Sequence, residues 1–333
     1  MDARRGVGQH LGVRYRRFGR LGWQVSEIGY GMWGMGGWTG SDDAQSLSAL
    51  DRAVERGCNF FDTAFAYGDG KSEQLLAETL RRHPGSRLHV ATKVPPKNRR
   101  WPGRASTPAC DVFPYEYVVE MTERSRKNLG VERIDLQQFH VWSDAWAEDD
   151  GWRRAVESLK RDGVIEGFGM SVNRWEPTNV FKALDSGLVD SVQVVYNVFD
   201  QAPEDELFPA CERADIALIA RVPFDEGSLT GALSVDDRWP EGDWRNLYFT
   251  PAHLETTLTR VEQLRPLVPA GGTLSDLALR FILHHPAVST TIPGMRRPSH
   301  VDANLAASDA PRLTETELAA LREHRWERDW QVP

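Results

Sequence analysis

The sequence predicts an α/β protein, a single (β/α)8 TIM barrel with an N-terminal β-hairpin before it and an extra C-terminal helix after it. Short apolar runs alternate with longer amphipathic runs along nearly the whole 333-residue chain. Many amphipathic runs end in glycine, which suits the left-handed residue that closes a helix. The apolar runs are apolar on both faces, as expected for parallel strands covered by helices. Eight such units with right-handed crossovers can close into a barrel.

The chain is long enough for two domains, but α/β barrels often reach this length as one. There is no clear linker, repeat or low-complexity tract, so we expect residues 14–333 to form one barrel domain. Residues 1–13 are expected to be a mobile N-terminal extension. The stretch RYRRFGRLGWQVSE, residues 14–27, has a Gly-rich centre and predicts a hairpin across the bottom of the barrel.

The barrel strands are expected in the apolar runs, which are residues 25–31, 59–64, 88–94, 134–140, 166–172, 191–197, 216–222 and 288–294. Helical patterns cover residues 43–57, 72–82, 116–130, 151–163, 178–187, 205–215 and 274–285, and a final helix is expected over residues 314–327. Segments 95–114 and 223–252 follow strands, so we expect them as long loops at the catalytic face of the barrel.

Composition narrows the class of protein. A net charge of -8 and a pI of about 5.7 disfavour nucleic acid as the main partner. Cys58, Cys110 and Cys211 are odd in number and irregular in spacing, so neither disulfides nor a metal site is expected. The N-terminus lacks the apolar core of a signal peptide, and no run approaches the ~18 apolar residues of a membrane span. These features favour a cytoplasmic protein without a membrane partner, either a monomer or a homo-oligomer.

Four polar residues lie at or just after the ends of successive strands. Asp62 and Tyr67 occur in FFDTAFAYG, Lys93 in ATKV and His140 in DLQQFH. Because neighbouring strands lie ~4.8 Å apart, these side chains can converge on one spot. A simpler alternative is a buried Asp–Lys pair with two satisfied polar neighbours, although such a pair seldom stabilises a fold much.

The residue types predict proton transfer to a carbonyl oxygen. A tyrosine has a pKa of ~10 and is a poor acid at neutral pH unless its phenolate is stabilised. The Lys93 ammonium is expected to lower that pKa, and Asp62 to keep Lys93 charged and in place. His140 can donate a hydrogen bond to a substrate oxygen.

The motifs FDTAxxYG, ATKV and QQFH together resemble the aldo-keto reductase superfamily, over almost the whole chain from Arg14 to the final helix. The resemblance implies that Asp62, Tyr67, Lys93 and His140 form a catalytic tetrad with Tyr67 as the general acid. It also implies a nicotinamide dinucleotide, NADPH in preference to NADH, as cofactor. No GxGxxG motif follows an early strand, so a Rossmann domain is not expected to hold this cofactor.

The same resemblance implies the cofactor-binding residues. The end of the first strand and the tetrad aspartate are expected beside the nicotinamide ribose. The GMSVN and VQVVYN motifs are expected beside the carboxamide. The loop after the seventh strand is expected along the pyrophosphate, and the stretch after the eighth strand around the adenosine end. These groups are Gly31, Met32, Trp33 and Asp62; Ser171, Asn173 and Gln193; Arg221, Val222, Pro223, Phe224, Gly227 and Leu229; and Gly294, Arg296, His300 and Asn304.

Three positions depart from the family pattern. Arg221 stands where an aromatic side chain often stacks on the nicotinamide, His300 where Gln or Arg is usual, and Ala303 where Glu is frequent. Two residues have simpler alternative roles, since Asn173 could cap a helix and Arg296 could be a solvated loop residue. If Arg296 binds the cofactor, its fork of donors suits a 2′-phosphate and favours NADPH.

The expected substrate pocket is aromatic. Tryptophans in the strand-end loops are Trp33, Trp38, Trp101, Trp142 and Trp146. The pocket is expected to comprise Trp33, Tyr67, His140 and Trp142, with Trp142 as its main wall. Such a pocket favours aldehydes or ketones of moderate size as the small-molecule substrate.

Three functions are open at this point. The first is an NADPH-dependent carbonyl reductase, and the second is a cofactor-sensing regulatory protein on the same fold, like the β subunits of potassium channels. The third is another barrel enzyme, such as a lyase or an isomerase, that binds no nicotinamide cofactor.

Overall fold

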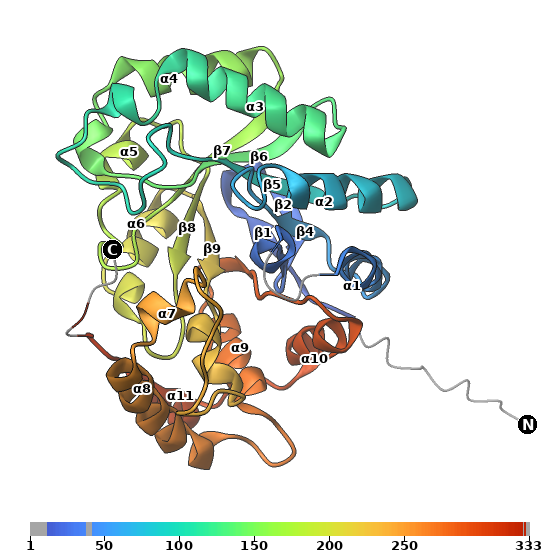
Figure 1. Cartoon of the computed structure of the whole chain (residues 1–333), viewed down its shortest axis with the longest axis vertical. Helices are drawn as coiled ribbons and strands as arrows, with labels where there is room; N and C mark the ends of the chain where they lie inside the picture. The colour runs from blue at the N-terminus through green and yellow to red at the C-terminus, as the bar shows by residue number, and fades with distance from the viewer. Residues whose placement is uncertain (1–11, 38–41, 329, 331–333) are drawn as a thin grey trace, which may run out of the picture.

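The computed structural model describes residues 12–37, 42–328 and 330. A parallel sheet of eight strands runs in sequential order and is surrounded by helices (Figure 1). Parallel bridges from Ile28 to Thr291 and from Gly31 to Gly294 join the first strand to the last. The (β/α)8 barrel is therefore confirmed. Its strands are β3 (Tyr30–Gly31), β4 (Phe60–Asp62), β5 (His89–Val94), β6 (Ile134–Phe139), β7 (Ile165–Ser171), β8 (Ser191–Val195), β9 (Ala217–Arg221) and β10 (Val288–Thr291).

The helices between the strands bury one apolar face each. In α4, Trp152, Ala155, Val156 and Leu159 recur at the spacing of one helix face, and the Asp149 side chain accepts a hydrogen bond from the Gly151 amide at the N-terminus. The helices are α1 (Asp43–Glu55), α2 (Lys71–Arg82), α3 (Tyr115–Leu129), α4 (Asp150–Arg161), α5 (Phe181–Asp185), α6 (Leu207–Arg213), α7 (Arg245–Tyr248), α8 (Pro251–Leu264), α9 (Leu274–His284), α10 (Pro298–Asp309) and α11 (Glu315–Arg322).

The expected hairpin is confirmed as β1 (Tyr15–Phe18) paired antiparallel with β2 (Trp23–Ser26). Phe18, Trp23 and Val25 are buried against Phe60, Ala91, Leu136, Ala217 and Ile219. The Arg20 amide donates to the Asp215 carbonyl at 2.7 Å, just before β9 begins. The hairpin therefore covers the amino ends of the strands and leaves their carboxyl ends for the site.

Several expected boundaries were wrong. The expected first strand, 25–31, is divided between the hairpin and β3, because Val25 and Ser26 pair with Arg16 and Tyr15. The helix expected over 178–187 begins only at Phe181, where the Asp144 carboxylate accepts from the amides of Lys182 and Ala183.

At the end of the chain, α11 stops at Arg322 instead of residue 327. The chain then turns, and the Trp326 amide donates to the Phe199 carbonyl at 2.9 Å. Helix α7 lies within segment 223–252, which was expected as a loop, and no helix had been predicted for α8 or α10, although each has a proline in its first turn. Of the expected extension, residues 1–11 lie outside the described residues, whereas Val13 is buried in the core.

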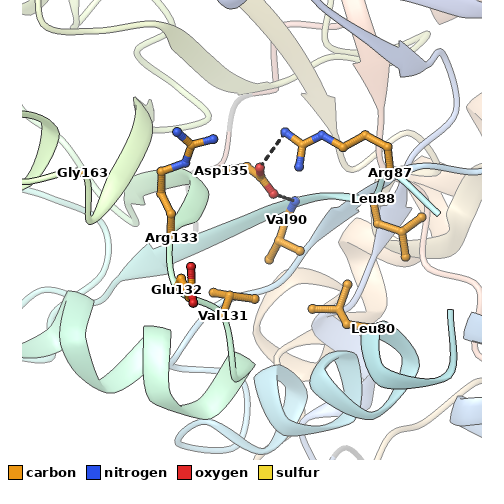
Figure 2. A pocket seen from close by; sticks show the side chains of 9 residues that line it. All are labelled: Leu80, Arg87, Leu88, Val90, Val131, Glu132, Arg133, Asp135 and Gly163. Atoms are coloured by element: carbon orange, nitrogen blue, oxygen red, sulfur yellow. Dashed lines mark hydrogen bonds and ion pairs between the residues drawn. The ribbon is translucent and has the colours of Figure 1, made fainter. Parts of the chain in front are cut away.

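A groove of about 480 Å³ lies at the amino end of the strands (Figure 2). Leu80 of α2, Val90 and Val131 line it, and Asp135 bridges to Arg87 at 3.0 Å and accepts from the Val90 amide at 2.9 Å. Because this groove opens beside the strand starts, it is separate from the predicted catalytic residues. None of the helices in the described part of the chain has the length and apolarity to cross a bilayer.

Candidate active site

The four predicted catalytic residues meet at the carboxyl ends of β4, β5 and β6. Asp62 is the last residue of β4, Lys93 is the fifth residue of β5, and His140 directly follows β6. Tyr67 lies in the turn between β4 and α2. Residues of adjacent parallel strands that share a register lie side by side, which is why these strand ends bring their side chains together.

A buried ion pair forms the centre of the site. The Lys93 Nζ donates to Asp62 Oδ1 at 2.5 Å and to the Thr63 carbonyl at 2.8 Å. The two charged side chains are only 1% and 3% exposed. A charge-assisted hydrogen bond in such surroundings fixes both groups in one geometry.

The second oxygen of Asp62 is also occupied. Gln193 Nε2 donates to Asp62 Oδ2 at 2.8 Å and Gln138 Nε2 donates to it at 3.0 Å. Gln138 was missed in the sequence, although it pairs with Lys93 in register across β5 and β6. Its place two residues before His140, on the same strand face, was the signal that could have identified it.

Tyr67 is held against this ion pair. Its hydroxyl lies 3.4 Å from Lys93 Nζ, and its ring meets the His140 ring edge-on, with centroids 5.6 Å apart. The Tyr67 backbone packs directly on Gly36, where a Cβ atom would lie 2.4 Å from the Tyr67 carbonyl carbon. Glycine at position 36 therefore lets the loop after β3 press the Tyr67 turn into place.

Burial and charge set the protonation states of the site. Burial raises the pKa of Tyr67 above 10, and the neighbouring Lys93 ammonium only partly opposes this rise. Desolvation of the phenolate outweighs the attraction of Lys93, so the net shift is upward although Lys93 acts in the expected direction. Burial also acts to lower the pKa of Lys93, but Asp62 and Tyr67 more than offset it, so this pKa is raised.

His140 is neutral at physiological pH. Burial first, and then the charges of Lys93 and Arg221, hold the pKa of His140 well below 6.5. Its buried Nδ1 atom has no hydrogen-bond partner among the described residues. A protonated phenol, a fixed ammonium and a neutral imidazole thus face one another, which suits donation of a proton to a substrate oxygen.

Of the residues expected to line the substrate pocket, Trp142 does not lie at the site. Trp142 is only 1% exposed, and its ring packs against Phe139, Trp146 and Trp152 behind β6. This placement argues against Trp142 as the pocket wall. Trp101 is 40% exposed and its ring meets His140 edge-on at 5.8 Å. Trp33 is also exposed, whereas Trp38 lies outside the described residues.

The residues expected to hold the nicotinamide amide lie in two neighbouring strands or just after one of them. Ser171 pairs with Gln193 in register across β7 and β8. The Asn173 amide donates to the Gly103 carbonyl at 3.1 Å and to the Glu176 carboxylate at 2.9 Å. Asn173 makes these contacts through its NH2 group, and Gln193 likewise contacts Asp62 through its NH2 group. The side-chain amide oxygens of the two residues take no part in these hydrogen bonds.

Arg221 ends β9 beside the catalytic residues. Its Nη2 donates to the Val172 carbonyl at 2.9 Å, while its buried Nε has no partner among the described residues. The charge of Arg221 contributes to the lowered pKa of His140. The loop that follows has positive φ at Val222, Asp225, Glu226 and Gly227. Within it, Pro223 and the Leu229 side chain are buried and Phe224 is partly buried.

The remaining predicted residues lie at the two outer strands. Gly31, Met32 and Trp33 end β3 or follow it, and Gly294 bridges to Gly31 after β10. The Arg296 side chain packs along Gly34, and its charge helps to lower the pKa of Asp243 in the long loop after β9. His300 and Asn304 lie on α10.

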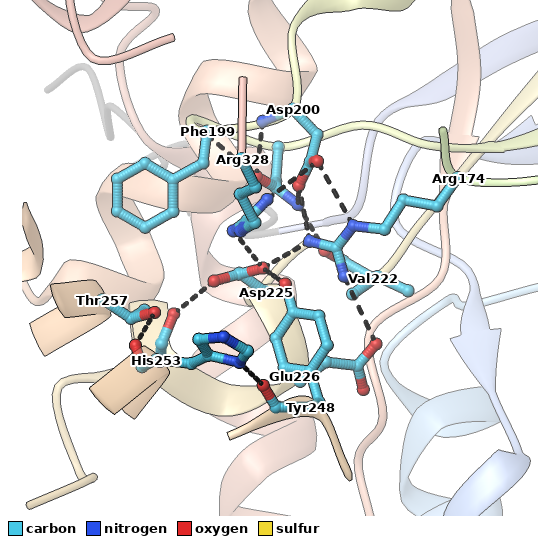
Figure 3. A network of polar contacts seen from close by, with 12 residues as sticks. Arg174, Phe199, Asp200, Val222, Asp225, Glu226, Tyr248, His253, Thr257 and Arg328 are labelled. Carbon is cyan, nitrogen blue, oxygen red and sulfur yellow. Dashed lines mark hydrogen bonds and ion pairs between the residues drawn. The ribbon is translucent and has the colours of Figure 1, made fainter. Parts of the chain in front are cut away.

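A buried charge cluster beside β7, β8 and β9 was missed in the sequence. We call it the Asp225 cluster, and it consists of Arg174, Asp200, Asp225 and Arg328 (Figure 3). Its members come from segments up to 154 residues apart (174 to 328), and no local pattern connects them.

A partly buried phenol beside a buried ammonium, at the carboxyl end of a (β/α)8 barrel, is the arrangement expected of an acid–base site. Residues 27–325 match the family model described as "Aldo/keto reductase family". The chain belongs to the aldo/keto reductase family, whose members are oxidoreductases that use nicotinamide cofactors.

Relatives along nearly the full length of the chain agree. The "Uncharacterized oxidoreductase YqkF" of Bacillus subtilis is 30% identical over 94% of this chain and 96% of its own length. The "NADH-specific methylglyoxal reductase" of Escherichia coli is 27% identical over 90% and 94%. The "Probable voltage-gated potassium channel subunit beta" of Arabidopsis thaliana is 27% identical over 91% and 93%.

Two solved structures have the same fold. The glycerol dehydrogenase AKR11B4 from Gluconobacter oxydans is 26% identical, with a TM-score of 0.78 over 93% of this chain and 94% of its own. The aldo-keto reductase AKR11C1 from Bacillus halodurans, in its holo form, is 26% identical with a TM-score of 0.74 over 95% and 99%.

Proposed function

We propose that this protein reduces an aldehyde or ketone to an alcohol with NADPH, and that Tyr67 is the general acid. The contact between Lys93 Nζ and the Tyr67 hydroxyl, 3.4 Å, beside the Asp62–Lys93 ion pair, carries the proposal. A lone buried ion pair would not need a phenol directed at its ammonium, whereas a proton donor does need a cation to stabilise the phenolate it becomes.

The side chains present fit a nicotinamide dinucleotide. Ser171, Asn173 and Gln193 offer neutral donors and acceptors, which match an uncharged carboxamide. The unpartnered Nε of Arg221 lies beside the catalytic residues, and a planar guanidinium can stack on a ring. Gly31, Met32, Trp33 and Asp62 would lie at the ribose. The pyrophosphate would lie along the loop of Val222, Pro223, Phe224, Gly227 and Leu229, and the adenosine end near Gly294, Arg296, His300 and Asn304.

The bound cofactor would supply a hydride to the carbonyl carbon. Tyr67 donates its proton to the carbonyl oxygen, and the Lys93 ammonium stabilises the phenolate that forms. Asp62 keeps Lys93 charged and oriented, and Gln138 and Gln193 in turn hold Asp62. His140, neutral at physiological pH, orients the substrate oxygen, and Trp33 and Trp101 offer apolar walls.

A panel of aldehydes and ketones tests the proposal, with NADPH oxidation followed for each member of the panel.

 Turnover of any member, with the alcohol identified as product, supports the reductase. Binding of NADPH without turnover across the whole panel supports the alternative, a cofactor-sensing regulatory protein, for which the Arabidopsis relative is the argument. If neither NADPH nor NADH binds, both functions are wrong, and a lyase or isomerase becomes the better hypothesis.

The preference for NADPH rests on Arg296, whose guanidinium suits a 2′-phosphate. The Escherichia coli relative is named NADH-specific, so the two cofactors are to be compared directly. We expect Arg296→Ala to weaken NADPH binding about tenfold or more, on the order of one lost charged hydrogen bond, and to leave NADH binding nearly unchanged. Fluorescence titration with each cofactor measures both constants, and an equal loss for the two cofactors would remove Arg296 from the 2′-phosphate site.

A further inference from the structure

The loop after β9 has a backbone that its sequence does not favour. Val222, Asp225 and Glu226 have φ values of 56°, 46° and 55°, in the left-handed region where residues other than glycine are uncommon. Val222 is β-branched, so its conformation is the most unusual of the three. Such a conformation is unfavourable for a residue other than glycine and persists only where its surroundings hold it.

The Asp225 carboxylate accepts four hydrogen bonds that hold this loop in place. Its Oδ1 accepts hydrogen bonds from Arg174 Nη2 at 2.5 Å, Arg328 Nη2 at 2.7 Å and the Tyr248 hydroxyl at 2.7 Å (Figure 3). Its Oδ2 accepts from the Ser228 hydroxyl at 2.8 Å. The side chain of one strained residue is therefore tied to elements on several sides of the loop.

Asp200 connects the same two arginines to the start of the loop. It accepts from Arg174 Nη2 at 2.7 Å and from Arg328 Nη1 at 3.0 Å. Asn197 Nδ2 donates both to Asp200 at 2.9 Å and to the Val222 carbonyl at 3.1 Å. Burial alone would raise the pKa of Asp200, but Arg174 and Arg328 lower it to about 2. Asp200 is thus a carboxylate at physiological pH.

The charges of the Asp225 cluster balance as two cations and two anions. Arg328 and Asp225 are both fully buried at the side chain, so neither has water to replace a lost partner. Glu226 lies 3.8 Å from Arg174, and burial raises the pKa of Glu226. Arg328 lies in the segment that follows α11, and it is the residue of the Asp225 cluster that comes from this segment.

We propose that Arg328 is a positioning residue for the cofactor, because it holds Asp225 and Asp200 and thereby keeps the loop of residues 222–229 in its strained conformation. This inference rests on the proposed function, in which that loop lines the pyrophosphate. The C-terminal segment then controls how tightly the dinucleotide binds without touching the substrate. When the competent loop conformation is only partly populated, the apparent dissociation constant rises in proportion.

Arg328→Met tests this proposal, because methionine keeps the apolar stem and removes both bonds to the carboxylates. We expect the dissociation constant of NADPH to rise at least tenfold and its dissociation rate to increase. The KM for the carbonyl substrate and kcat at saturating NADPH should stay within about threefold of the wild-type values. Fluorescence titration, a stopped-flow chase and steady-state kinetics measure these quantities.

Three variants serve as comparisons. Arg325→Met is the matched control, since Arg325 lies in the same segment but pairs with the partly exposed Asp205 at 2.7 Å. Its NADPH binding should not change. Arg328→Lys should lie between Met and wild type, because an ammonium lacks the fork that reaches two carboxylates. In Arg328→Met with Asp225→Asn, the effects on binding should be less than additive, since Arg328 acts through Asp225.

Hydrogen exchange of the amides in residues 222–229 separates failure of this inference from failure of the proposed function. Faster exchange in Arg328→Met than in Arg325→Met supports the positioning role even if the wild-type protein binds no dinucleotide. The inference is overturned if exchange in this loop is unchanged, if NADPH binding stays within twofold, or if Arg325→Met has the same effect. Should Arg328→Met fail to fold, the same criteria apply to Arg328→Lys.

Discussion

The ion pair of the candidate site differs in exposure from several ion pairs at the opposite end of the barrel. At the carboxyl end, Asp62 and Lys93 are almost completely buried. At the amino end, Arg133 and Glu166 are 49% and 26% exposed, and Arg17 and Asp215 are about half exposed. Exposed pairs are worth about 0–1 kcal/mol, whereas burying a pair incurs a desolvation penalty that can exceed its attraction. The Asp62–Lys93 pair is therefore better explained by chemistry than by stability.

Backbone strain follows the same division. Of the six non-glycine residues with positive φ in the described ranges, five lie in segments that follow strands: Asp69, Arg99, Val222, Asp225 and Glu226. The sixth, Asp215, precedes β9 at the amino end, where its carbonyl accepts from the hairpin amide of Arg20. The amino end is closed by apolar packing of the hairpin, which leaves the carboxyl end free to hold strained loops.

The largest expected effect is on catalysis at the carboxyl end. Tyr67→Phe removes the proton donor but keeps the ring against His140, so kcat should fall by about 10²–10⁴, the usual contribution of a general acid. NADPH binding should stay within about twofold. The matched control at the amino end is Tyr15→Phe, which loses a hydroxyl bond to the Gly57 carbonyl and should keep full activity. Steady-state kinetics with NADPH measures both variants, and wild-type activity in Tyr67→Phe would exclude Tyr67 as the acid.

The next effect is on stability. Lys93→Met leaves Asp62 buried without its cation, so the free energy of unfolding should fall by about 3–5 kcal/mol, and activity should be severely impaired. Urea denaturation measures the loss. Adding Asp62→Asn removes the uncompensated charge and should restore part of the stability without restoring activity. If the double variant were no more stable than Lys93→Met, the stability loss would not come from the stranded carboxylate.

How far the sequence predicts this site depends on where a residue sits relative to the strands. Asp62, Lys93 and His140 could be located because strand periodicity and strand ends fix their direction. Trp142 could not, because the chain turns after the strand, and the indole packs on Trp152 of α4 rather than over the site. The Asp225 cluster could not be found either. Arg174 and Arg328 come together at Asp200 only once the barrel has closed and the segment after α11 has folded back against it.

A smaller effect is expected on the pH dependence of stability, from His89 at the amino end of the barrel. Burial, and then the charge of Arg87, lower the pKa of His89 to about 4, while its unfolded value is about 6.5. Between these values the unfolded state binds more protons, so the free energy of unfolding falls as pH falls from about 6.5 to about 4. His89→Phe keeps a ring beside Trp23 and should flatten this dependence, with activity at pH 7 unchanged. Urea denaturation at several pH values measures the slope, and a slope equal to that of the wild type would show that His89 is not the group responsible.

The smallest expected effect is at the exposed ion pairs of the amino end. Arg133→Met removes the partner of Glu166, but Arg87 lies 3.9 Å from the same carboxylate and the Trp23 indole donates to it at 2.9 Å. Because the pair is exposed and Glu166 keeps other partners, the free energy of unfolding should change by about 0–1 kcal/mol, with no change in activity. Urea denaturation beside Lys93→Met makes the comparison directly. A loss as large as that of Lys93→Met would mean that exposure does not distinguish the Arg133–Glu166 pair from the Asp62–Lys93 pair, and the argument that assigns the Asp62–Lys93 pair to catalysis would lose its basis.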